Sequence, residues 1–383
     1  MLSPYWVPVF DRLSQKGWDI RVFVANELEP GREYDRASMT PTSFEVKKTA
    51  NCVLRIPGLK GRTGFVHLQY GLWRELKAWQ PDVILSSELG FRTIISLLFG
   101  LRAGVPMIPW VCASSHTERN NSFLREYFRK RILAKAPCVC TNHTEATEYL
   151  RKGLGVATNK IFQTPYTIDV AGFNTKILSV RGRATELKGQ LGLRTKVYLY
   201  VGQIIPRKGL SELARGIVAV DRELLQDVSF LFVGGQLPDD VRNSLTVRGI
   251  HFAEVPFVQP RDLPQYYAMS DVFVFPSLED EWGIVLNEAA AAGLPIIASK
   301  FAAATADLVE DNVNGFVIDP YDPVQVTAAI GKVAAMSPES LGRLGNASYR
   351  RALDIGIDFT LLNMYRALLF AQDTFGQQAT LQP

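Results

Sequence analysis

Residues 271–288 read Asp-Val-Phe-Val-Phe-Pro-Ser-Leu-Glu-Asp-Glu-Trp-Gly-Ile-Val-Leu-Asn-Glu, and their pattern indicates the fold class. Its start is a continuous apolar run, which is typical of a strand buried on both faces of a sheet. An acidic loop with Gly283 follows, and a helical pattern begins at Ile284. A strand that leads through a loop into a helix is the unit of a parallel α/β sheet. The N–H groups at the start of such a helix favour an anion such as phosphate.

A second stretch repeats this order of strand, glycine loop and helix. It reads Tyr-Val-Gly-Gln-Ile-Ile-Pro-Arg-Lys-Gly-Leu over residues 200–210. Arg207 and Lys208 fall at the helix start, where the helix dipole disfavours cations. A bound anion such as a diphosphate would explain two cations in this place. The alternative is a pair of solvated surface cations.

Short apolar strands alternate with helical segments along the whole chain. We predict strands at residues 19–25, 82–86, 106–113 and 138–141, and a second series at 196–201, 228–233, 251–255, 271–275, 295–299 and 315–318. We predict helices at residues 7–15, 65–79, 121–135, 145–152, 208–220, 284–292 and 323–335. The pattern breaks near residues 165–193. The sequence therefore predicts two doubly wound α/β domains that face one another across a cleft, with ligands at the carboxyl ends of the strands.

The first domain lacks one expected element. A doubly wound domain opens with a strand, but this sequence begins with Ser3-Pro4-Tyr5 and the predicted helix 7–15. We expect either a truncated start or a first sheet without its usual first strand.

The net charge of +4 conceals an asymmetry between two parts of the chain. Residues 1–168 hold 23 Lys and Arg against 14 Asp and Glu, and residues 169–383 hold 19 against 24. One part is therefore basic and the other acidic. With 47% hydrophobic and 21% charged residues, the composition excludes a disordered chain, a collagen and a coiled-coil rod.

The cysteines and apolar segments indicate a cytoplasmic protein. Cys52, Cys112, Cys138 and Cys140 show no metal-ligand spacing, and the last three lie in apolar runs typical of buried free thiols. The longest apolar stretch, residues 93–101, is far shorter than the roughly 20 residues of a membrane span. The first residues lack the basic region and apolar core of a secretion signal. We expect any membrane contact to be peripheral, on the inner face.

Two carboxylates of the first stretch are candidate binding groups. Asp280 and Glu288 are eight residues apart, from loop to helix, so they can flank one ligand and accept its hydroxyl groups. Glu288 lies on an apolar helix beside Leu286 and residues 289–292, and a carboxylate buried there needs a partner. The alternative is that the acids at 279–281 complement the helix dipole and that Glu288 is solvated.

These segments resemble the retaining GT-B glycosyltransferases of family 4, which transfer a sugar from a nucleotide sugar. The resemblance covers nearly the whole chain and is most specific over residues 196–320. It extends to Ala292-Gly293-Leu294-Pro295, to Asn314-Gly315-Phe316 and to Ile168-Asp169 before Phe173. It implies an acceptor-side domain at residues 1–169, with a C-terminal helix at 359–383 packing back on it. It also implies a nucleotide-sugar-binding domain at residues 170–358.

The resemblance implies roles for residues of both stretches. Glu288 is expected to bind the ribose hydroxyls and Asp280 the hydroxyls of the donor sugar. Backbone N–H groups at the Trp282-Gly283 turn are expected to contact sugar and phosphate, and Lys208 to neutralise the diphosphate. The other expected members of the site are Gly202, Gln203, Ile284 and Arg207.

Three positions depart from the family pattern. Asp280 stands where Glu is more frequent. Gln203 replaces the arginine that usually follows the strand glycine, so we expect Arg207 to supply the missing charge. Ala303 stands where a glycine is usual, which suggests a different backbone geometry in that loop.

His116 is the catalytic candidate of the first domain. It follows the predicted strand 106–113, and at a strand end it could donate to a donor hydroxyl or to developing charge. The family often has a histidine on this side of the cleft, although a lone histidine is more often structural. Glu118, Arg119 and His143 are weaker candidates.

The predicted helix 121–135 combines aromatic residues with cations. Phe123, Tyr127 and Phe128 interleave with Arg125, Arg129, Lys130, Arg131 and Lys135. Such a helix is typical of contact with an anionic membrane surface. The alternative is an exposed domain helix with its apolar stripe in the core. No nucleic-acid motif accompanies the charge, so we expect no nucleic-acid partner.

We therefore predict a retaining hexosyltransferase that uses a UDP- or GDP-sugar as substrate and needs no cofactor and no metal. No Asp-x-Asp motif occurs, so Arg207, Lys208 and helix dipoles are expected to stabilise the departing diphosphate. The expected acceptor is a hydroxyl of a glycan or lipid-linked precursor in surface polysaccharide or glycolipid synthesis. The alternatives are an epimerase on the same fold and a non-catalytic partner subunit that binds a nucleotide sugar.

Overall fold

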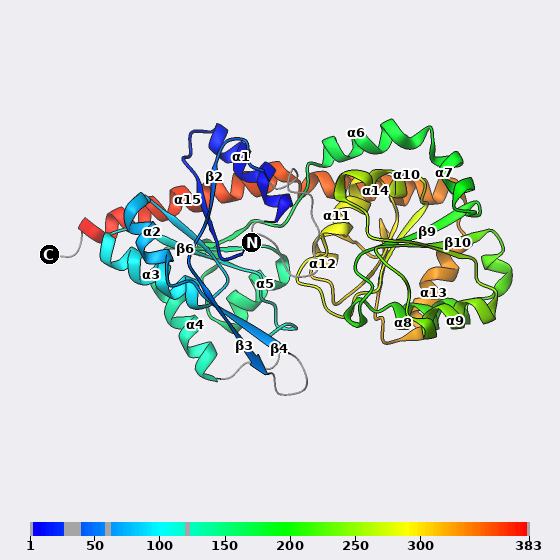
Figure 1. The fold of residues 1–383 in the computed structure, drawn as a ribbon, viewed down its shortest axis with the longest axis horizontal. Helices are drawn as coiled ribbons and strands as arrows, with labels where there is room; N and C mark the ends of the chain where they lie inside the picture. Colours follow the sequence, from blue (N-terminus) through cyan, green and yellow to red (C-terminus); the bar gives the residue numbers. More distant parts are fainter. Residues whose placement is uncertain (1–2, 27–39, 58–62, 119–122, 381–383) are drawn as a thin grey trace. The chain divides into compact units, whose positions relative to one another are not determined.

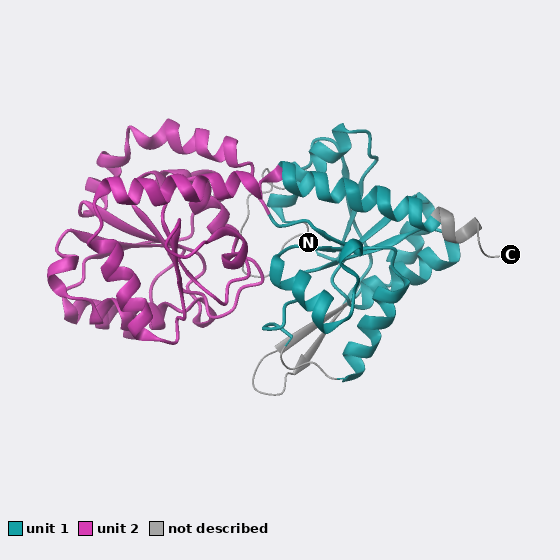
Figure 2. Ribbon diagram, turned by 180° about the vertical axis from the view of Figure 1, so that it is seen from behind, with its two compact units in different colours: residues 1–166, 358–383 teal, residues 167–357 magenta. Residues whose placement is uncertain are grey.

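The computed structural model describes residues 3–26, 40–57, 63–118 and 123–380 (Figure 1). The chain forms two compact units (Figure 2). Unit 1 comprises residues 1–166 and 358–383, and unit 2 comprises residues 167–357. Each unit contains a parallel sheet with helices, so the predicted fold class of two α/β domains is confirmed.

Unit 2 is built on a six-stranded parallel sheet. The spatial order is β11 (Phe252–Val255), β10 (Val228–Val233), β9 (Lys196–Val201), β12 (Val272–Phe275), β13 (Ile296–Ser299) and β14 (Gly315–Ile318). The chain starts at β9 in the centre, moves outward to β11, and then returns to the centre at β12. Ligands of doubly wound sheets bind at the carboxyl ends of the two strands that flank such a reversal.

Helices cover both faces of this sheet (Figure 1). One layer contains α8 (Leu210–Ala219), α9 (Asp239–Arg248) and α13 (Pro323–Ala334). The other contains α6 (Val170–Arg181), α10 (Pro264–Ala268), α11 (Ile284–Ala291) and α14 (Pro338–Asp354). Two further helices are α7 (Ala184–Gln190) and α12 (Thr305–Leu308). All residues of β10, β12 and β13 are buried, as expected of strands covered on both sides.

Unit 1 contains a four-stranded parallel sheet in the order β5 (Ile84–Ser87), β6 (Met107–Val111), β7 (Val139–Thr141) and β8 (Ile161–Gln163). β1 (Arg21–Val24) pairs in parallel with β2 (Glu45–Lys48), and β3 (Cys52–Pro57) pairs antiparallel with β4 (Thr63–Leu68). Its helices are α1 (Val7–Gln15), α2 (Leu72–Trp79), α3 (Phe91–Ala103), α4 (Phe123–Lys135), α5 (Thr144–Glu148) with a π-helical turn at Tyr149–Gly153, and most of α15 (Ile357–Thr380).

The C-terminal helix α15 contacts the first part of the chain. Thr360 Oγ1 donates to the carbonyl of Pro165 at 3.0 Å, and the rings of Phe162 and Phe370 lie 5.6 Å apart. The Cys138 thiol donates to the carbonyl of Ala367 at 3.5 Å. Residues 358–383 therefore complete unit 1.

Two sequence predictions are wrong in this fold. The predicted helix 65–79 extends the pattern of α2 too far upstream, because residues up to Leu68 belong to β4 and α2 begins only after Gly71. The predicted break at 165–193 contains α6 and α7. Asp169 caps α6 by accepting a hydrogen bond from the Gly172 amide at 3.1 Å, and only two residues of α6 are buried, so its apolar period is weak.

The four cysteines are free thiols. Cys138 and Cys140 are buried as predicted, and burial raises the pKa of the Cys138 thiol to about 12 and raises that of Cys140 further. Cys112 is partly exposed. Within the described ranges, no helix combines the length and apolar character needed to cross a membrane.

Helices α8 and α13 pack closely together at Gly216. A Cβ atom there would lie 2.3 Å from Cγ1 of Val326, so a side chain would force the helices apart. We predict that Gly216→Ala lowers the free energy of unfolding by about 1–3 kcal/mol. Gly342 of α14 is the matched control, because a Cβ atom there meets no other atom within 4 Å. Gly342→Ala should stabilise by up to about 1 kcal/mol. Denaturant unfolding measures both, and equal stability of the two variants would contradict this packing.

Candidate functional site

The two stretches singled out in the sequence meet at one edge of the unit 2 sheet. β9 and β12 are parallel neighbours, with Tyr198 opposite Val272 and Leu199 opposite Phe273. The loop at 202–209 follows β9, and the loop at 276–283 follows β12. Both loops therefore leave the sheet at the point where the strand order reverses, which is where parallel sheets bind ligands.

The backbones of these two loops are in direct contact. Gly209 ends a short 3₁₀ turn at Pro206–Lys208 with φ +72°, and a Cβ atom there would lie 2.1 Å from the carbonyl oxygen of Pro276. The Leu278 amide donates to the carbonyl of Arg207 at 2.8 Å. Glycine at 209 is therefore required both by its backbone angle and by the close approach.

Lys208 and Asp280 form an ion pair across the two loops. Their side chains are only 11% and 14% exposed, and Lys208 Nζ also lies 5.1 Å from the centre of the Phe275 ring. Arg207, in contrast, is exposed and donates to the carbonyl of Glu279 at 3.2 Å. The residues expected to bind diphosphate and sugar therefore contact one another.

Hydrogen bonds to the sheet strands β9 and β10 hold the rest of the loop after β9. The Tyr200 hydroxyl donates to the carbonyl of Gln203 at 2.9 Å, and the Gly202 amide donates to the carbonyl of Val233 at 2.9 Å. Burial raises the pKa of the Tyr200 phenol, and the charge of Asp280 raises it further. Tyr200 thus stays a neutral donor that fixes the backbone at Gln203.

The Trp282-Gly283 turn leads into α11. Gly283 has φ +93°, and a Cβ atom there would lie 2.8 Å from the Phe275 ring. Trp282 is buried, and its indole N–H donates to Asn287 Oδ1 at 2.7 Å. The tryptophan side chain therefore fixes the turn from inside, and Ile284 begins the helix at this edge of the sheet.

Glu288 is 2% exposed, so it is buried and not a solvated face residue. Its Oε2 accepts a hydrogen bond from the hydroxyl of Tyr267 at 2.7 Å. Tyr267 is also buried, on α10, where its ring packs against Phe273 and Phe173. The sequence reasoning missed Tyr267, because nothing in Gln265-Tyr266-Tyr267 distinguishes this tyrosine from its neighbour.

His116 lies in unit 1, in a turn after β6, and is partly buried. The turn is stabilised at its base, since the Ser114 amide donates to Thr117 Oγ1 at 2.9 Å and Thr117 Oγ1 donates to the Ser114 carbonyl at 3.1 Å. The structure therefore places His116 at a strand end, as predicted.

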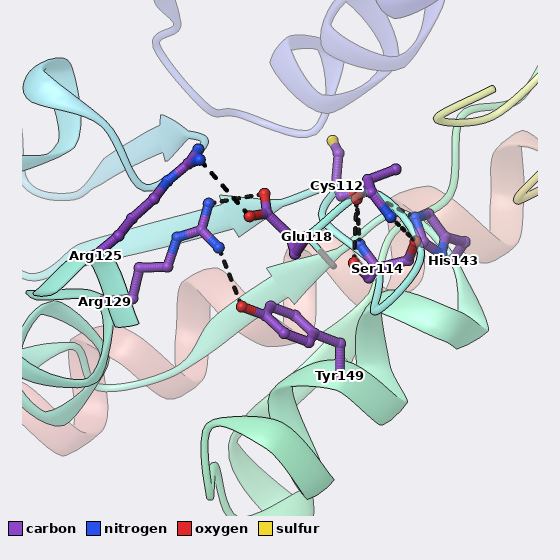
Figure 3. A network of polar contacts seen from close by, with 8 residues as sticks. Cys112, Ser114, Glu118, Arg125, Arg129, His143 and Tyr149 are labelled. Atoms are coloured by element: carbon purple, nitrogen blue, oxygen red, sulfur yellow. Dashed lines mark hydrogen bonds and ion pairs between the residues drawn. The ribbon is translucent and has the colours of Figure 1, made fainter. Parts of the chain in front are cut away.

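Glu118 belongs to a polar network in unit 1 (Figure 3). Arg129 donates to Glu118 at 2.8 Å and to the Tyr149 hydroxyl at 3.0 Å, and Arg125 lies 3.8 Å from Glu118. Burial alone would lower the pKa of Arg129, but the hydrogen bond and charge of Glu118 raise it overall. The network ties α4 to the turn after β6 and to the π-helical turn after α5. Arg119 and residues 121–122 of the predicted helix lie outside the described residues.

His143 has a structural role. It is fully buried, its Nδ1 accepts from the Ala146 amide at 2.9 Å, and its Nε2 donates to the Cys112 carbonyl at 2.9 Å (Figure 3). The ring thereby caps α5 and joins the ends of β6 and β7. Among all the described residues, no three His, Cys, Asp or Glu side chains lie close enough together to hold a metal ion.

Comparison with known proteins identifies a matching family over the candidate site. Residues 184–351 match the family described as glycosyl transferases group 1. The D-inositol 3-phosphate glycosyltransferase of Thermomonospora curvata is 27% identical, covering 99% of this chain and 92% of that protein. The GDP-mannose-dependent alpha-(1-6)-phosphatidylinositol monomannoside mannosyltransferase of Mycolicibacterium smegmatis is 26% identical, covering 70% of this chain and 68% of that protein.

The fold is similar to that of Anabaena Alr3699/HepE, solved in complex with UDP. The TM-score is 0.71 at 16% identity, and 96% of each chain is covered. This similarity shows that the two α/β domains form the GT-B fold. Together with the family match over 184–351, it supports a glycosyltransferase of the GT-B class. The matched segment includes Lys208, Asp280 and Glu288.

The buried Tyr267–Glu288 hydrogen bond should stabilise unit 2. We predict that Tyr267→Phe lowers the free energy of unfolding by about 1.5–3 kcal/mol, because a carboxylate in the interior loses a donor. Tyr266→Phe is the matched control, since it removes the same atom from the neighbouring, less buried residue. Thermal and denaturant unfolding compare the two variants. If both unfold like the unmodified chain, the hydrogen bond does not hold Glu288.

Proposed function

We propose that this protein is a retaining, metal-independent glycosyltransferase of family 4 that moves a hexose from a UDP- or GDP-sugar to a hydroxyl group. The observation that carries the proposal is the convergence of Lys208, Asp280 and Glu288 at the strand-order reversal of unit 2. The nucleotide sugars of two similar proteins support the donor class. Alr3699/HepE has been solved with UDP-glucose, and the Mycolicibacterium smegmatis relative is GDP-mannose-dependent.

Each predicted residue has a place in this reaction. Glu288 binds the ribose hydroxyls, Asp280 binds hydroxyls of the sugar, and Lys208 with Arg207 stabilises the diphosphate. The backbone at Gly202, Gln203, Trp282, Gly283 and Ile284 lines the donor. The bond from the anomeric carbon to the diphosphate breaks with its electron pair on the phosphate oxygen. The acceptor oxygen bonds to the same face of that carbon and gives its proton to the departing phosphate. His116 remains a predicted donor to the sugar or the developing charge.

Glu288 variants test the donor site. We predict that Glu288→Gln, which keeps an acceptor for Tyr267, lowers the affinity for the nucleotide sugar tenfold or more, because charged hydrogen bonds contribute about 1.5–3 kcal/mol. Glu288→Ala should abolish nucleotide release. Calorimetric titration with UDP-glucose and GDP-mannose measures binding, and Glu310→Ala, an exposed acid of the same unit, is the control. Unchanged donor binding and nucleotide release in a folded Glu288 variant would falsify the assignment.

Two assays separate the alternatives. An epimerase converts the donor without any acceptor, so the sugar product of an acceptor-free reaction identifies it. A non-catalytic partner subunit binds the donor tightly but turns over no acceptor. The substitution of Gln203 for the usual arginine motivates this second alternative.

We also propose that the acceptor is a glycan or lipid-linked precursor of a surface polysaccharide or glycolipid, and that the protein works in the cytoplasm at the inner face of a membrane. Support comes from the surface of unit 1. Among the described residues of α4, Phe123 is 86% exposed, and Leu124, Tyr127 and Phe128 are exposed beside Arg131 and Lys135. The aromatic side chains of this helix therefore lie outside the core.

Helix α3 neighbours α4 (Figure 1) and exposes apolar side chains while it buries small and polar ones. Its outer face carries Phe91, Ile94, Leu98 and Leu101, all exposed, whereas its inner face buries Thr93, Ser96 and Gly100 together with Phe99. Arg102 is exposed at its end, and α3 has no acidic residue. An apolar helix face with cations beside it fits a bilayer with anionic headgroups. A dimer that paired two copies of this face would bring like charges together.

A vesicle experiment tests this surface. We predict that the protein sediments with phosphatidylglycerol vesicles, less with phosphatidylcholine vesicles, and less at high salt. Leu98→Glu should weaken binding tenfold or more, because burying a leucine contributes about 1.5–3 kcal/mol. Val247→Glu is the control, since Val247 is exposed on α9 of unit 2. Vesicle binding that Leu98→Glu leaves unchanged contradicts the proposal. A change of oligomeric state caused by Leu98→Glu in the absence of vesicles would also contradict it, because that result would indicate that this face binds protein.

A further inference from the structure

The Lys208–Asp280 ion pair joins two groups that the proposed function assigns to different parts of the donor. Lys208 is assigned to the diphosphate and Asp280 to the sugar. In the structure these two groups contact each other. Both side chains are largely buried, so solvent and salt screen the interaction weakly.

A bound nucleotide sugar is compatible with this pair. An ammonium group has three N–H donors, so Lys208 can bind a phosphate oxygen while it keeps a hydrogen bond to Asp280. A carboxylate accepts several hydrogen bonds, so Asp280 can also accept from hydroxyl groups of the donor sugar. The donor therefore supplies partners for both members of the pair.

The spent nucleotide is less compatible with the pair. After transfer, the sugar hydroxyls are gone, and at neutral pH the terminal phosphate carries an additional negative charge. Asp280 then faces a more negative ligand with no hydroxyl group between them, and it competes with the phosphate for Lys208. Both effects weaken the binding of the nucleoside diphosphate relative to the donor.

From this geometry we infer that Asp280 determines the discrimination between the nucleotide sugar and the spent nucleoside diphosphate. By holding Lys208, it lowers the affinity for the product and so accelerates product release. This inference rests on the proposed function, and it adds a role for Asp280 beyond contact with the sugar. Arg207 does not share this role, because it is exposed and bonded to a backbone carbonyl.

Asp280→Asn tests the inference, because it keeps the shape of the side chain and removes its charge. We expect the affinity for UDP or GDP to rise about tenfold while the affinity for the matching UDP-glucose or GDP-mannose falls. Calorimetric titration of the full chain measures both ligands. A variant that binds both ligands more weakly, or that changes only the donor affinity, overturns the inference. Failure of the unmodified chain to bind either ligand would instead contradict the proposed function.

A double-mutant cycle tests whether Asp280 acts through Lys208. Lys208→Gln should weaken the binding of both ligands, and adding Asp280→Asn to it should raise the nucleoside diphosphate affinity by clearly less than tenfold, because only the direct repulsion between Asp280 and the phosphate remains. A full tenfold gain in the double variant would contradict the inference that Asp280 competes with the phosphate for Lys208.

Asp319→Asn is the matched control, because Asp319 pairs with Lys300 at 2.8 Å at the ends of β14 and β13. It should leave both affinities unchanged, and melting temperatures verify that every variant is folded.

Discussion

The contact between Gly209 and the carbonyl of Pro276 is the constraint on which the candidate site depends. It fixes the distance between the loop after β9 and the loop after β12, because a carbonyl oxygen occupies the space where any side chain at 209 would lie. The hydrogen bond from the Leu278 amide to the Arg207 carbonyl adds to the same contact. Lys208 and Asp280 meet only because the two backbones are this close.

Buried polar side chains then hold groups of the candidate site in place. Tyr267 holds Glu288, Asn287 holds the indole of Trp282, and Tyr200 holds the carbonyl of Gln203. The bonds of Glu288 and Trp282 are buried, where an unpaired polar group costs about 1–3 kcal/mol, and the bond of Tyr200 is partly buried. Such bonds favour one geometry over its alternatives. The site is therefore organised before any ligand arrives.

The sequence predicts the strands of unit 2 closely but not the contacts of the site. β9, β10 and β14 have the predicted bounds, because continuous apolar runs end at glycine or polar residues. The sequence does not predict the antiparallel pair of β3 and β4 or the helix α6, since short strands and weakly amphipathic helices leave little periodic signal. The Lys208–Asp280 pair joins residues 72 positions apart, and no local pattern encodes such a contact.

The net charge of unit 2 gives the Lys208–Asp280 ion pair a large effect on the binding of anions. Unit 2 contains 18 basic and 22 acidic side chains, so the unit as a whole does not attract an anion. A diphosphate site in this unit depends on local cations and on the start of α11. Because Gln203 is uncharged and Arg207 is exposed, Lys208 is the only buried cation that the loops at 202–209 and 276–283 contribute. In the proposed donor site, a single carboxylate bonded to that lysine would therefore control much of the positive potential available to a phosphate, and the absence of charge at Gln203 would make the affinity for the spent nucleotide more sensitive to Asp280.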